Sequence, residues 1–254
     1  MNHNKLIIDQ FTQQAIPFTN KPEHSQESSL KLLLRMSGVS SSDTVLDVAC
    51  GSGIVACAFA EVAKQVTGID ITPAMIEQAR RLQQEKQLHN LTWHPRDILP
   101  LPYPETSFSL VISRYAFHHF TDPKSVISEM VRVCSAGGRV MVVDVAPAPE
   151  KVDAYDRVEK LRDPSHTRAL TLVEFQDMAI SAGLHNIKTD FYHLEMELEQ
   201  QLQASFPHPG DADKIRQLFW EDLGRDILGV GAHLKGEAIY FTYPIAVIIG
   251  QKQT

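Results

Sequence analysis

The sequence predicts an α/β fold built around a mostly parallel sheet. Between residues 44 and 146, short runs rich in β-branched residues alternate with stretches of helical periodicity, which is the pattern of βαβ units. A glycine-containing loop at residues 51–53 directly follows the first apolar run. The length of 254 residues and the 43% of hydrophobic side chains are sufficient for a large buried core. We therefore expect a single α/β domain over residues 1–254.

The alternating region contains five expected strands and three expected helices. The strands are Thr44–Ala49, Val66–Ile71, Leu91–Asp97, Phe108–Ser113 and Arg139–Val145. The helices are Ile54–Ala63, Pro73–Gln87 and Asp122–Cys134. Thr72 is a suitable N-cap for the second helix, and Pro73 suits its first position because proline is pre-organised there. This order gives three crossovers between parallel strands.

After Pro147 the pattern changes. A charged amphipathic helix is expected at Val152–Arg162 and ends at Asp163-Pro164, because proline cannot continue a helix. A further helix is expected at Leu172–Ala182, before Gly183. Residues 186–197 and 238–249 resemble two more strands. The stretch between them is mostly helical, and we expect it to pack over the strand ends as a cap.

These patterns divide the domain into four parts. They are an N-terminal arm at 1–37, a ligand-binding half at 38–150, a substrate half with the cap at 151–236, and a last strand at 237–254. In the arm, Phe11, Ala15 and Phe18 follow helical spacing and form one apolar face. We expect Pro17 to end this helix before Phe18.

The charge and cysteine content exclude several classes of function. The 24 Lys and Arg against 31 Asp and Glu give a net charge of −7, and no basic run could follow a phosphate backbone. We therefore expect no nucleic-acid partner. The three cysteines form no C-x-x-C pair, and the histidines show no metal-ligand spacing, so we expect no metal. The N-terminal residues lack a signal-peptide core and no apolar run has 18 residues, which predicts a cytoplasmic protein without membrane insertion. Nothing in the sequence indicates an oligomeric state.

The segment VLDVACGSG at residues 45–53 predicts a nucleotide-type ligand site. Gly51 and Gly53 let a ligand approach the backbone at the start of a helix. With Ala56 in the third position, the loop also fits a dinucleotide fingerprint. However, Asp47 would repel a pyrophosphate there, whereas it would attract the sulfonium and ammonium groups of S-adenosylmethionine. Asp70 ends the next strand, where it can accept hydrogen bonds from ribose hydroxyls.

Four segments together resemble the class I methyltransferases, and within them the UbiE-like (methyltransferase type 11) group of small-molecule enzymes. The segments are VLDVACGSG at 45–53, VTGIDITPAMIEQAR at 66–80, RDILPLPYPETSFSLVISRYAFHHF at 96–120 and SEMVRVCSAGGRVMVVD at 128–144. The resemblance covers about residues 40 to 185. It implies a Rossmann-like sheet whose last strand is antiparallel.

The resemblance also implies roles for individual residues. It places Asp47, Gly51 and Gly53 at the methionine end of S-adenosylmethionine and Asp70 at its ribose. Ile71 and Met75 would flank the nucleoside, and Asp97 with the Ile98 backbone would bind the adenine. Ala49 and Arg114 complete the expected cofactor-binding set.

The acceptor site is expected just beyond the fourth strand. In-line methyl transfer needs a base only when the acceptor is protonated, and otherwise depends on positioning. His119, His118 and Tyr115 are the catalytic candidates, because an unperturbed imidazole can act as a base near neutral pH. Phe18, Tyr115, His119, Arg162 and His166 are the substrate-binding candidates, the last two carried by the turn at Asp163-Pro164.

The predicted function is therefore methyl transfer from S-adenosylmethionine to a small molecule, which leaves S-adenosylhomocysteine. Phenols, amines and carbon nucleophiles remain open as acceptors. One alternative is an S-adenosylmethionine-binding protein that does not methylate, as a sensor, cyclase or isomerase. The other is an NAD(P)-dependent oxidoreductase, which Asp47 and the lack of a Tyr-x-x-x-Lys motif disfavour.

Overall fold

The computed structural model describes residues 3–19 and 26–253, apart from the side chain of Phe18. Its strands are β1 Thr44–Val48, β2 Gln65–Asp70, β3 Leu91–Pro95, β4 Phe108–Arg114, β5 Cys134–Val145, β6 Leu184–Glu197, β7 His233–Lys235 and β8 Ala238–Lys252. Its α-helices are α1 His3–Thr19, α2 Glu27–Ser37, α3 Ile54–Ala60, α4 Pro73–Glu85, α5 Pro123–Val133, α6 Val152–Arg162, α7 Leu172–Ser181, α8 Leu198–Gln203 and α9 Asp211–Asp222. Short 3-10 helices in the described part of the chain are η2 Phe117–His119 and η3 Pro149–Lys151.

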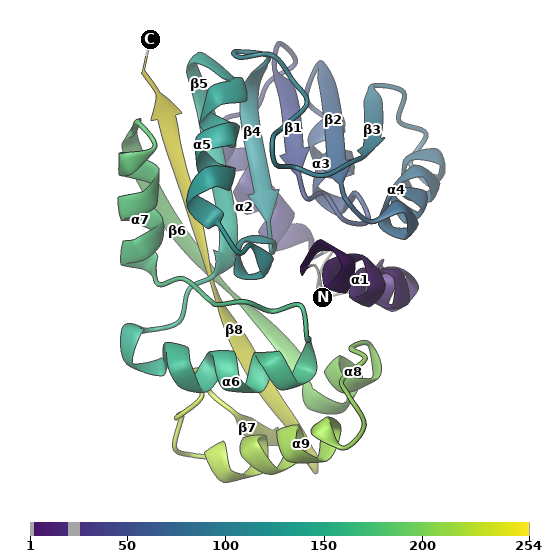
Figure 1. The fold of residues 1–254 in the computed structure, drawn as a ribbon, viewed down its shortest axis with the longest axis vertical. Helices are drawn as coiled ribbons and strands as arrows, with labels where there is room; N and C mark the ends of the chain where they lie inside the picture. Colours follow the sequence, from purple (N-terminus) through teal and green to yellow (C-terminus); the bar gives the residue numbers. More distant parts are fainter. Residues whose placement is uncertain (1–2, 20–25, 254) are drawn as a thin grey trace.

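The described strands form one sheet in the order β3-β2-β1-β4-β5-β8-β6, with β7 paired to β8 (Figure 1). Strands β1 to β5 pair in parallel, whereas β8 is antiparallel to both β5 and β6. This confirms the predicted Rossmann-like α/β fold with an antiparallel last strand. The chain runs from β1 outward to β3 and then returns to β4 on the other side of β1. A ligand crevice is expected where the strand order reverses in this way.

The sheet is buried on both faces, because its strands carry apolar residues at successive positions. Side chains alternate between the two faces along a strand. Leu110 and Ile112 of β4 therefore join one core cluster, whereas Val111 between them joins the other. The first cluster continues into the cap, where it includes Phe219 of α9. The cap therefore packs in the same hydrophobic core as the sheet whose strand β1 precedes the glycine loop.

The predicted cap is confirmed as a mainly helical insertion. Strands β6 and β8 extend beyond the parallel strands, and α6, α8, α9 and β7 gather around these extensions (Figure 1). Helix α6 begins and ends as expected, because Asp163 and Pro164 leave the helical conformation. Helix α7 carries a capping box between Thr171 and Glu174.

The N-terminal region differs from the expectation. Helix α1 does not end before Phe18 but continues through Pro17 to Thr19, so that prediction was wrong. A proline inside a helix removes one backbone hydrogen bond and bends the helix. Pro17 lies two residues before the end of α1, so only a short segment follows the bend. The Thr19 hydroxyl also donates to the Ala15 carbonyl at 2.6 Å, which satisfies an acceptor of the last turn. Helix α2 was not expected at all, although Leu33 on it is fully buried.

No helix in the described part of the chain is long and apolar enough to cross a membrane.

Candidate functional site

The larger of two adjoining cavities lies at the carboxyl ends of β1, β2 and β4. It measures about 1090 Å³ to its open mouth. The lining includes nine of the ten residues that the sequence predicts for the cofactor, namely Asp47, Ala49, Gly51, Asp70, Ile71, Met75, Asp97, Ile98 and Arg114. The crevice at the strand reversal is therefore a formed cavity.

The glycine loop turns sharply between β1 and α3. Ala49 and Gly51 both have positive φ, of 55° and 52°. A Cβ added to Gly51 would meet nothing within 4 Å, so the backbone conformation rather than space favours glycine there. Gly53, the tenth predicted cofactor residue, does not line the cavity. A Cβ at Gly53 would lie 2.6 Å from the Trp93 ring and 2.8 Å from the Ala79 Cβ, so this glycine allows close packing of α3 instead.

Asp47 lines this cavity, and one of its carboxylate oxygens can still accept a hydrogen bond. It is 1% exposed, and its Oδ2 has no hydrogen-bond partner in the described structure. Burial raises the pKa of Asp47 to about 7, against the lowering effect of the Arg114 charge. A buried acceptor without a partner is costly. A cationic donor in this cavity would satisfy it.

Asp70 is fixed at the end of β2. Its two carboxylate oxygens accept backbone bonds from Gly51 at 2.9 Å and from Thr72 at 2.8 Å. Burial raises the pKa of Asp70, although both backbone bonds act in the opposite direction. Each carboxylate oxygen can accept more than one hydrogen bond. Asp70 can therefore hold a vicinal diol in a bidentate manner.

Helix α1 forms one side of the cavity. His3, Asn4, Ile7 and Phe11 all line it. The Asn4 amide donates to Asp97 Oδ2 at 2.6 Å, and His3 Nε2 lies 2.7 Å from the His119 carbonyl oxygen. The sequence indicated an apolar face on this helix but not its polar contacts. A ligand in the cavity is thus enclosed by the N-terminal arm.

The second cavity adjoins the first on the cap side. It measures about 660 Å³ and is bounded by residues of α1, η2, β5, α6, β6, α8 and β8. Phe11, Tyr115 and His119 line both cavities and form the wall between them. Tyr115 has a φ of 57° and is held by a backbone bond to Val143 at 2.8 Å. A non-glycine residue in this conformation marks a position that the surrounding structure imposes.

His118 and Asp144 form a dyad in the second cavity. His118 Nδ1 lies 2.6 Å from Asp144 Oδ1, and the carboxylate also accepts the backbone N–H groups of Phe117 and Val145 at 2.7 Å each. Burial alone would lower the pKa of His118, but the charge and hydrogen bond of Asp144 outweigh it and raise that pKa. Because Nδ1 faces Asp144, Nε2 is the nitrogen available to the cavity.

His119 is in a different electrostatic setting. Burial and the neighbouring His118 lower the pKa of His119 to about 3. Its Nδ1 lies 3.1 Å from both the hydroxyl and the carbonyl oxygen of Ser165, and Phe11 packs edge-on against its ring. His119 therefore stays neutral at physiological pH. The two adjacent histidines differ in basicity because only His118 contacts a carboxylate.

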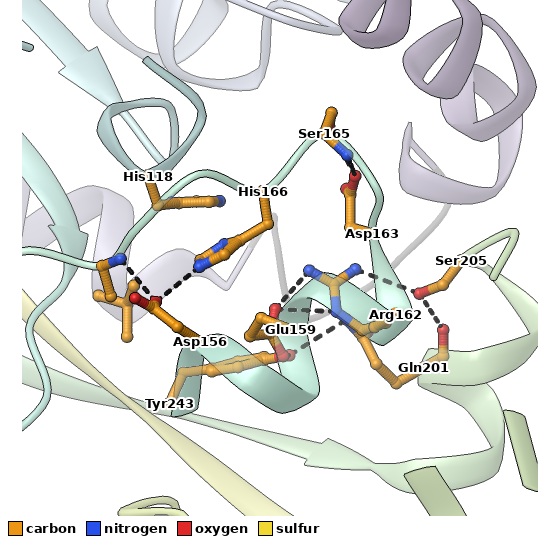
Figure 2. Close-up of polar contacts among 12 residues, drawn as sticks. His118, Asp156, Glu159, Arg162, Asp163, Ser165, His166, Gln201, Ser205 and Tyr243 are labelled. Carbon is orange, nitrogen blue, oxygen red and sulfur yellow. Dashed lines mark hydrogen bonds and ion pairs between the residues drawn. The ribbon is translucent and has the colours of Figure 1, made fainter. Parts of the chain in front are cut away.

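Arg162 reaches the second cavity, as the sequence predicts. Figure 2 shows its guanidinium between Glu159 on one side and Ser205 on the other. Glu159 Oε2 accepts from Arg162 Nε at 2.9 Å and from Nη2 at 2.6 Å. The Tyr243 hydroxyl donates to the other Glu159 oxygen at 3.0 Å. The ion pair is buried, with side chains 13% and 5% exposed.

His166 lies in neither cavity. Its Nε2 lies 2.7 Å from Asp156 Oδ1, and its ring lies 5.5 Å from that of His118 (Figure 2). The predicted substrate contact of His166 therefore has no support from the cavity lining, because its ring lies behind that of His118. Phe18, the other arm residue expected at the substrate, has a side chain outside the described residues.

The sequence interpretation missed Asp144, Glu159 and Tyr155, which all line the second cavity. Of these three residues, only Asp144 could have been recognised from the sequence as a candidate site residue. It is an acid at the carboxyl end of a strand, in the same position on β5 that Asp47 and Asp70 occupy near the ends of β1 and β2. The other two lie on the predicted helix α6, where the sequence does not indicate which face meets a cavity.

Comparisons with known proteins agree with this geometry. The family described as a methyltransferase domain matches residues 46–142. The chain is 28% identical over 250 residues to the uncharacterized methyltransferase YcgJ of Bacillus subtilis, which covers 96% of this chain and 98% of that protein. It is 39% identical over 105 residues to the demethylmenaquinone methyltransferase of Deinococcus radiodurans, covering 41% and 43% of the two chains.

Solved structures show the same fold. The crystal structure of YcgJ aligns with a TM-score of 0.82 at 26% identity, over 90% of this chain and 100% of that one. The cyclase SpnF aligns with a TM-score of 0.63 at 19% identity, over 89% and 81% of the two chains, and supports the fold alone. The glycine loop, the acid at each strand end and these relatives agree: residues 46–142 match a methyltransferase domain, and the chain has the fold of the class I S-adenosylmethionine-dependent methyltransferases and is similar to members of their UbiE-like group.

Proposed function

We propose that the first cavity holds S-adenosylmethionine, that the second holds a small-molecule acceptor, and that His118 is the general base. The observation that carries this proposal is the arrangement of the two cavities. They share the wall formed by Phe11, Tyr115 and His119, and the His118–Asp144 dyad lies on the acceptor side of it. A methyl donor in the first cavity and an acceptor in the second would lie next to each other where these three side chains border both cavities.

The residues of the first cavity fit S-adenosylmethionine better than a dinucleotide. The unpartnered Oδ2 of Asp47 would accept from the ammonium group, and Asp70 would accept from the ribose hydroxyls. Asp97, with its Oδ1 accepting from the backbone of Ile98 at 2.7 Å, would accept from the adenine amino group. A pyrophosphate would instead face the buried carboxylate of Asp47. This disfavours the oxidoreductase alternative.

When bound, S-adenosylmethionine supplies a methyl group attached to a positively charged sulfur. His118 Nε2 would accept the proton of the acceptor, and Asp144 would fix the tautomer and stabilise the resulting imidazolium. His119 stays neutral and would act with Tyr115 as a positioning wall. The sequence names both His119 and His118 as candidates for the base, and the proposal selects His118 because, of the two histidines, only His118 makes a hydrogen bond with Asp144.

The test is methyl transfer by the whole protein in a screen of small-molecule fractions with methyl-labelled S-adenosylmethionine. The proposal predicts a labelled product that forms in step with S-adenosylhomocysteine. The variant His118→Gln should abolish this transfer while leaving the affinity for S-adenosylhomocysteine within about threefold of wild type. His233→Gln is the matched control, since His233 lies on β7 and borders neither cavity.

Three results would contradict the proposal. NADH binding in preference to S-adenosylhomocysteine would indicate the oxidoreductase alternative. Conversion of an acceptor without consumption of the methyl donor would indicate a cyclase or isomerase that uses the same fold. Full activity of His118→Gln would remove the histidine from the mechanism but leave methyl transfer intact.

A further inference from the structure

The second cavity holds carboxylates that are already satisfied by the chain. Asp144 accepts three hydrogen bonds, from His118 and two backbone N–H groups. Glu159 accepts from Tyr243 and twice from Arg162. The third carboxylate, Asp163, accepts from the backbone and hydroxyl of Ser165 at 2.9 and 2.6 Å and from Gln14 at 3.3 Å. Each of these acids thus has about one of its four acceptor positions left for an incoming ammonium group.

Arg162, in contrast, has N–H groups that are not used in hydrogen bonds. A guanidinium carries five N–H donors. Three contacts use them in the described structure, two to Glu159 and one to the Ser205 hydroxyl at 3.2 Å, so two N–H donors remain (Figure 2). Arg162 borders the second cavity, where these donors would meet a ligand. Its planar shape and fixed position on α6 suit recognition of a ligand oxygen.

Tyr155 offers a second free donor in the same cavity. Its side chain is 3% exposed, and its hydroxyl makes no hydrogen bond to the described residues. Burial raises the pKa of Tyr155 well above its ordinary value, so the hydroxyl stays protonated and can donate. The unused groups of the cavity are therefore donors on α6 and one acceptor, His118 Nε2, near the wall to the first cavity.

The charges of the cavity disfavour an anionic ligand. The pKa values of Asp144, Glu159 and Asp163 are all lowered, because nearby cations and hydrogen bonds outweigh the effect of burial. These three carboxylates are ionised at neutral pH and face the Arg162 guanidinium and the His118 imidazole, whose pKa is raised. A ligand carboxylate or phosphate would add another negative charge to a buried region that already has an excess of them.

We propose that the second cavity selects a neutral acceptor with a nucleophilic hydroxyl group at one end and a carbonyl-type oxygen at the other, a hydroxyaryl ketone being the simplest example. The carbonyl oxygen accepts from Arg162 and Tyr155, the hydroxyl meets His118, and the rings of Phe11 and Tyr115 pack on the aryl group. This inference rests on the proposed function, and names the acceptor class for it.

The transfer that follows is an O-methylation. The hydroxyl proton moves to His118 Nε2, and an oxygen lone pair forms the new bond to the methyl carbon. The sulfur–methyl bond of the donor breaks with its electron pair left on sulfur, which gives a neutral thioether and a methyl ether. The proton on His118 then leaves to solvent, so that charge and atoms balance over the cycle.

Three probes of one size test the charge selection. They are para-hydroxyacetophenone, para-hydroxybenzoate and para-hydroxybenzylamine, which share the ring and hydroxyl and differ in the charge of the distal group. Their dissociation constants are measured by ligand-observed NMR on the full-length protein saturated with S-adenosylhomocysteine. We expect the neutral ketone to bind at least about tenfold more tightly than either charged probe. Equal or tighter binding of a charged probe, or no ketone binding up to millimolar concentration, would overturn the inference.

Variants of α6 test whether Tyr155 and Arg162 recognise the carbonyl oxygen. Tyr155→Phe and the double variant Glu159→Gln/Arg162→Met should each lower the preference for the ketone over para-cresol, which lacks the carbonyl, by about fivefold or more. The double variant removes both charges of the buried pair, so neither partner is left uncompensated. The matched control is Glu199→Gln/Arg216→Met, an exposed pair with an N–O distance of 2.7 Å between α8 and α9, which should leave the preference unchanged. An unchanged preference in both α6 variants would overturn the assignment of these donors.

Binding and turnover separate the two proposals. Selective binding of the ketone without any formation of S-adenosylhomocysteine would support the selectivity and contradict the proposed function. Methylation of para-hydroxybenzoate in preference to the ketone would support methyl transfer and overturn the charge selection.

Discussion

The protonation of Asp47 should make cofactor affinity depend on pH. In the free protein, burial raises the pKa of Asp47 to about 7. A bound ammonium group favours the ionised carboxylate, so a proton must leave Asp47 when the ligand binds. Lowering the pH therefore opposes binding, and affinity should fall as the pH drops through about 7. This is the direction expected for a group whose pKa is lower in the complex than in the free protein.

The magnitude follows from the fraction of Asp47 that is ionised. With a pKa near 7, the dissociation constant of S-adenosylhomocysteine should rise about eightfold between pH 7.5 and pH 6. The variant Asp47→Asn should remove this dependence and weaken binding at pH 7.5 by about 10- to 150-fold, because a hydrogen bond to a charged group contributes roughly 1.5–3 kcal/mol. Calorimetric titration at several pH values measures both effects.

Two controls make this experiment specific. Asp177→Asn changes an exposed carboxylate on α7 that borders neither cavity, and should behave as wild type. His119 does not titrate in this range, because its pKa is lowered to about 3. If the pH dependence persists in Asp47→Asn, another group such as Asp70 is responsible, and the account of the unpartnered carboxylate is refuted.

Three further predictions concern other positions. Asp70→Ala should weaken S-adenosylhomocysteine binding by about 10- to 150-fold through loss of charge-assisted bonds to the ribose, and unchanged affinity by calorimetry would contradict this. Asp144→Asn should lower kcat by about 100-fold or more, and the wild-type kcat should fall as the pH drops through the raised pKa of His118, since protonated His118 cannot accept a proton. A flat wild-type pH–rate profile would exclude it as the base. Arg162→Ala should lower the free energy of unfolding by about 3–5 kcal/mol, because it leaves Glu159 buried without its partner, and chemical denaturation that detects a loss below 1 kcal/mol would refute this.

The groups around His118 determine that pH profile. It faces Asp144 on β5, His119 on η2, and Glu159 and Arg162 on α6, with His166 beneath its ring. Asp144 and Glu159 raise the pKa of His118, whereas burial and Arg162 lower it. The Asp144→Asn variant should therefore shift the apparent pKa of the profile downward.

The sequence was most informative where local pattern and chemistry coincide. The alternation of apolar runs and helices predicted the order of the elements, and nine predicted cofactor residues line one cavity. Gly53 does not line that cavity, and the sequence could not show this, because a glycine that allows packing and one that approaches a ligand look identical in a sequence. The ring of Trp93, from a strand 40 residues later, determines which it is.

The acceptor side was less predictable, because it depends on long-range contacts. The sequence presents His118 and His119 as equivalent neighbours. Asp144 distinguishes them, and its contact with His118 spans 26 residues of chain. In the same way, Arg162 and His166 lie on one predicted turn, yet only Arg162 reaches the cavity. Arg162 is the last residue of α6 and His166 follows in the turn, so long-range contacts such as that of Tyr243 on β8 with Glu159 decide which of the two side chains reaches the cavity.

A single-turnover measurement on the wild type and His118→Gln tests the central claim most directly. Each protein is saturated with methyl-labelled S-adenosylmethionine and mixed with para-hydroxyacetophenone, and the labelled ether and S-adenosylhomocysteine are followed together. We predict that wild type forms both at the same rate, and that His118→Gln is slower by about 100-fold or more at equal cofactor occupancy. Equal rates in the two proteins, or ketone turnover without S-adenosylhomocysteine, would contradict the claim that His118 promotes methyl transfer across the wall between the cavities.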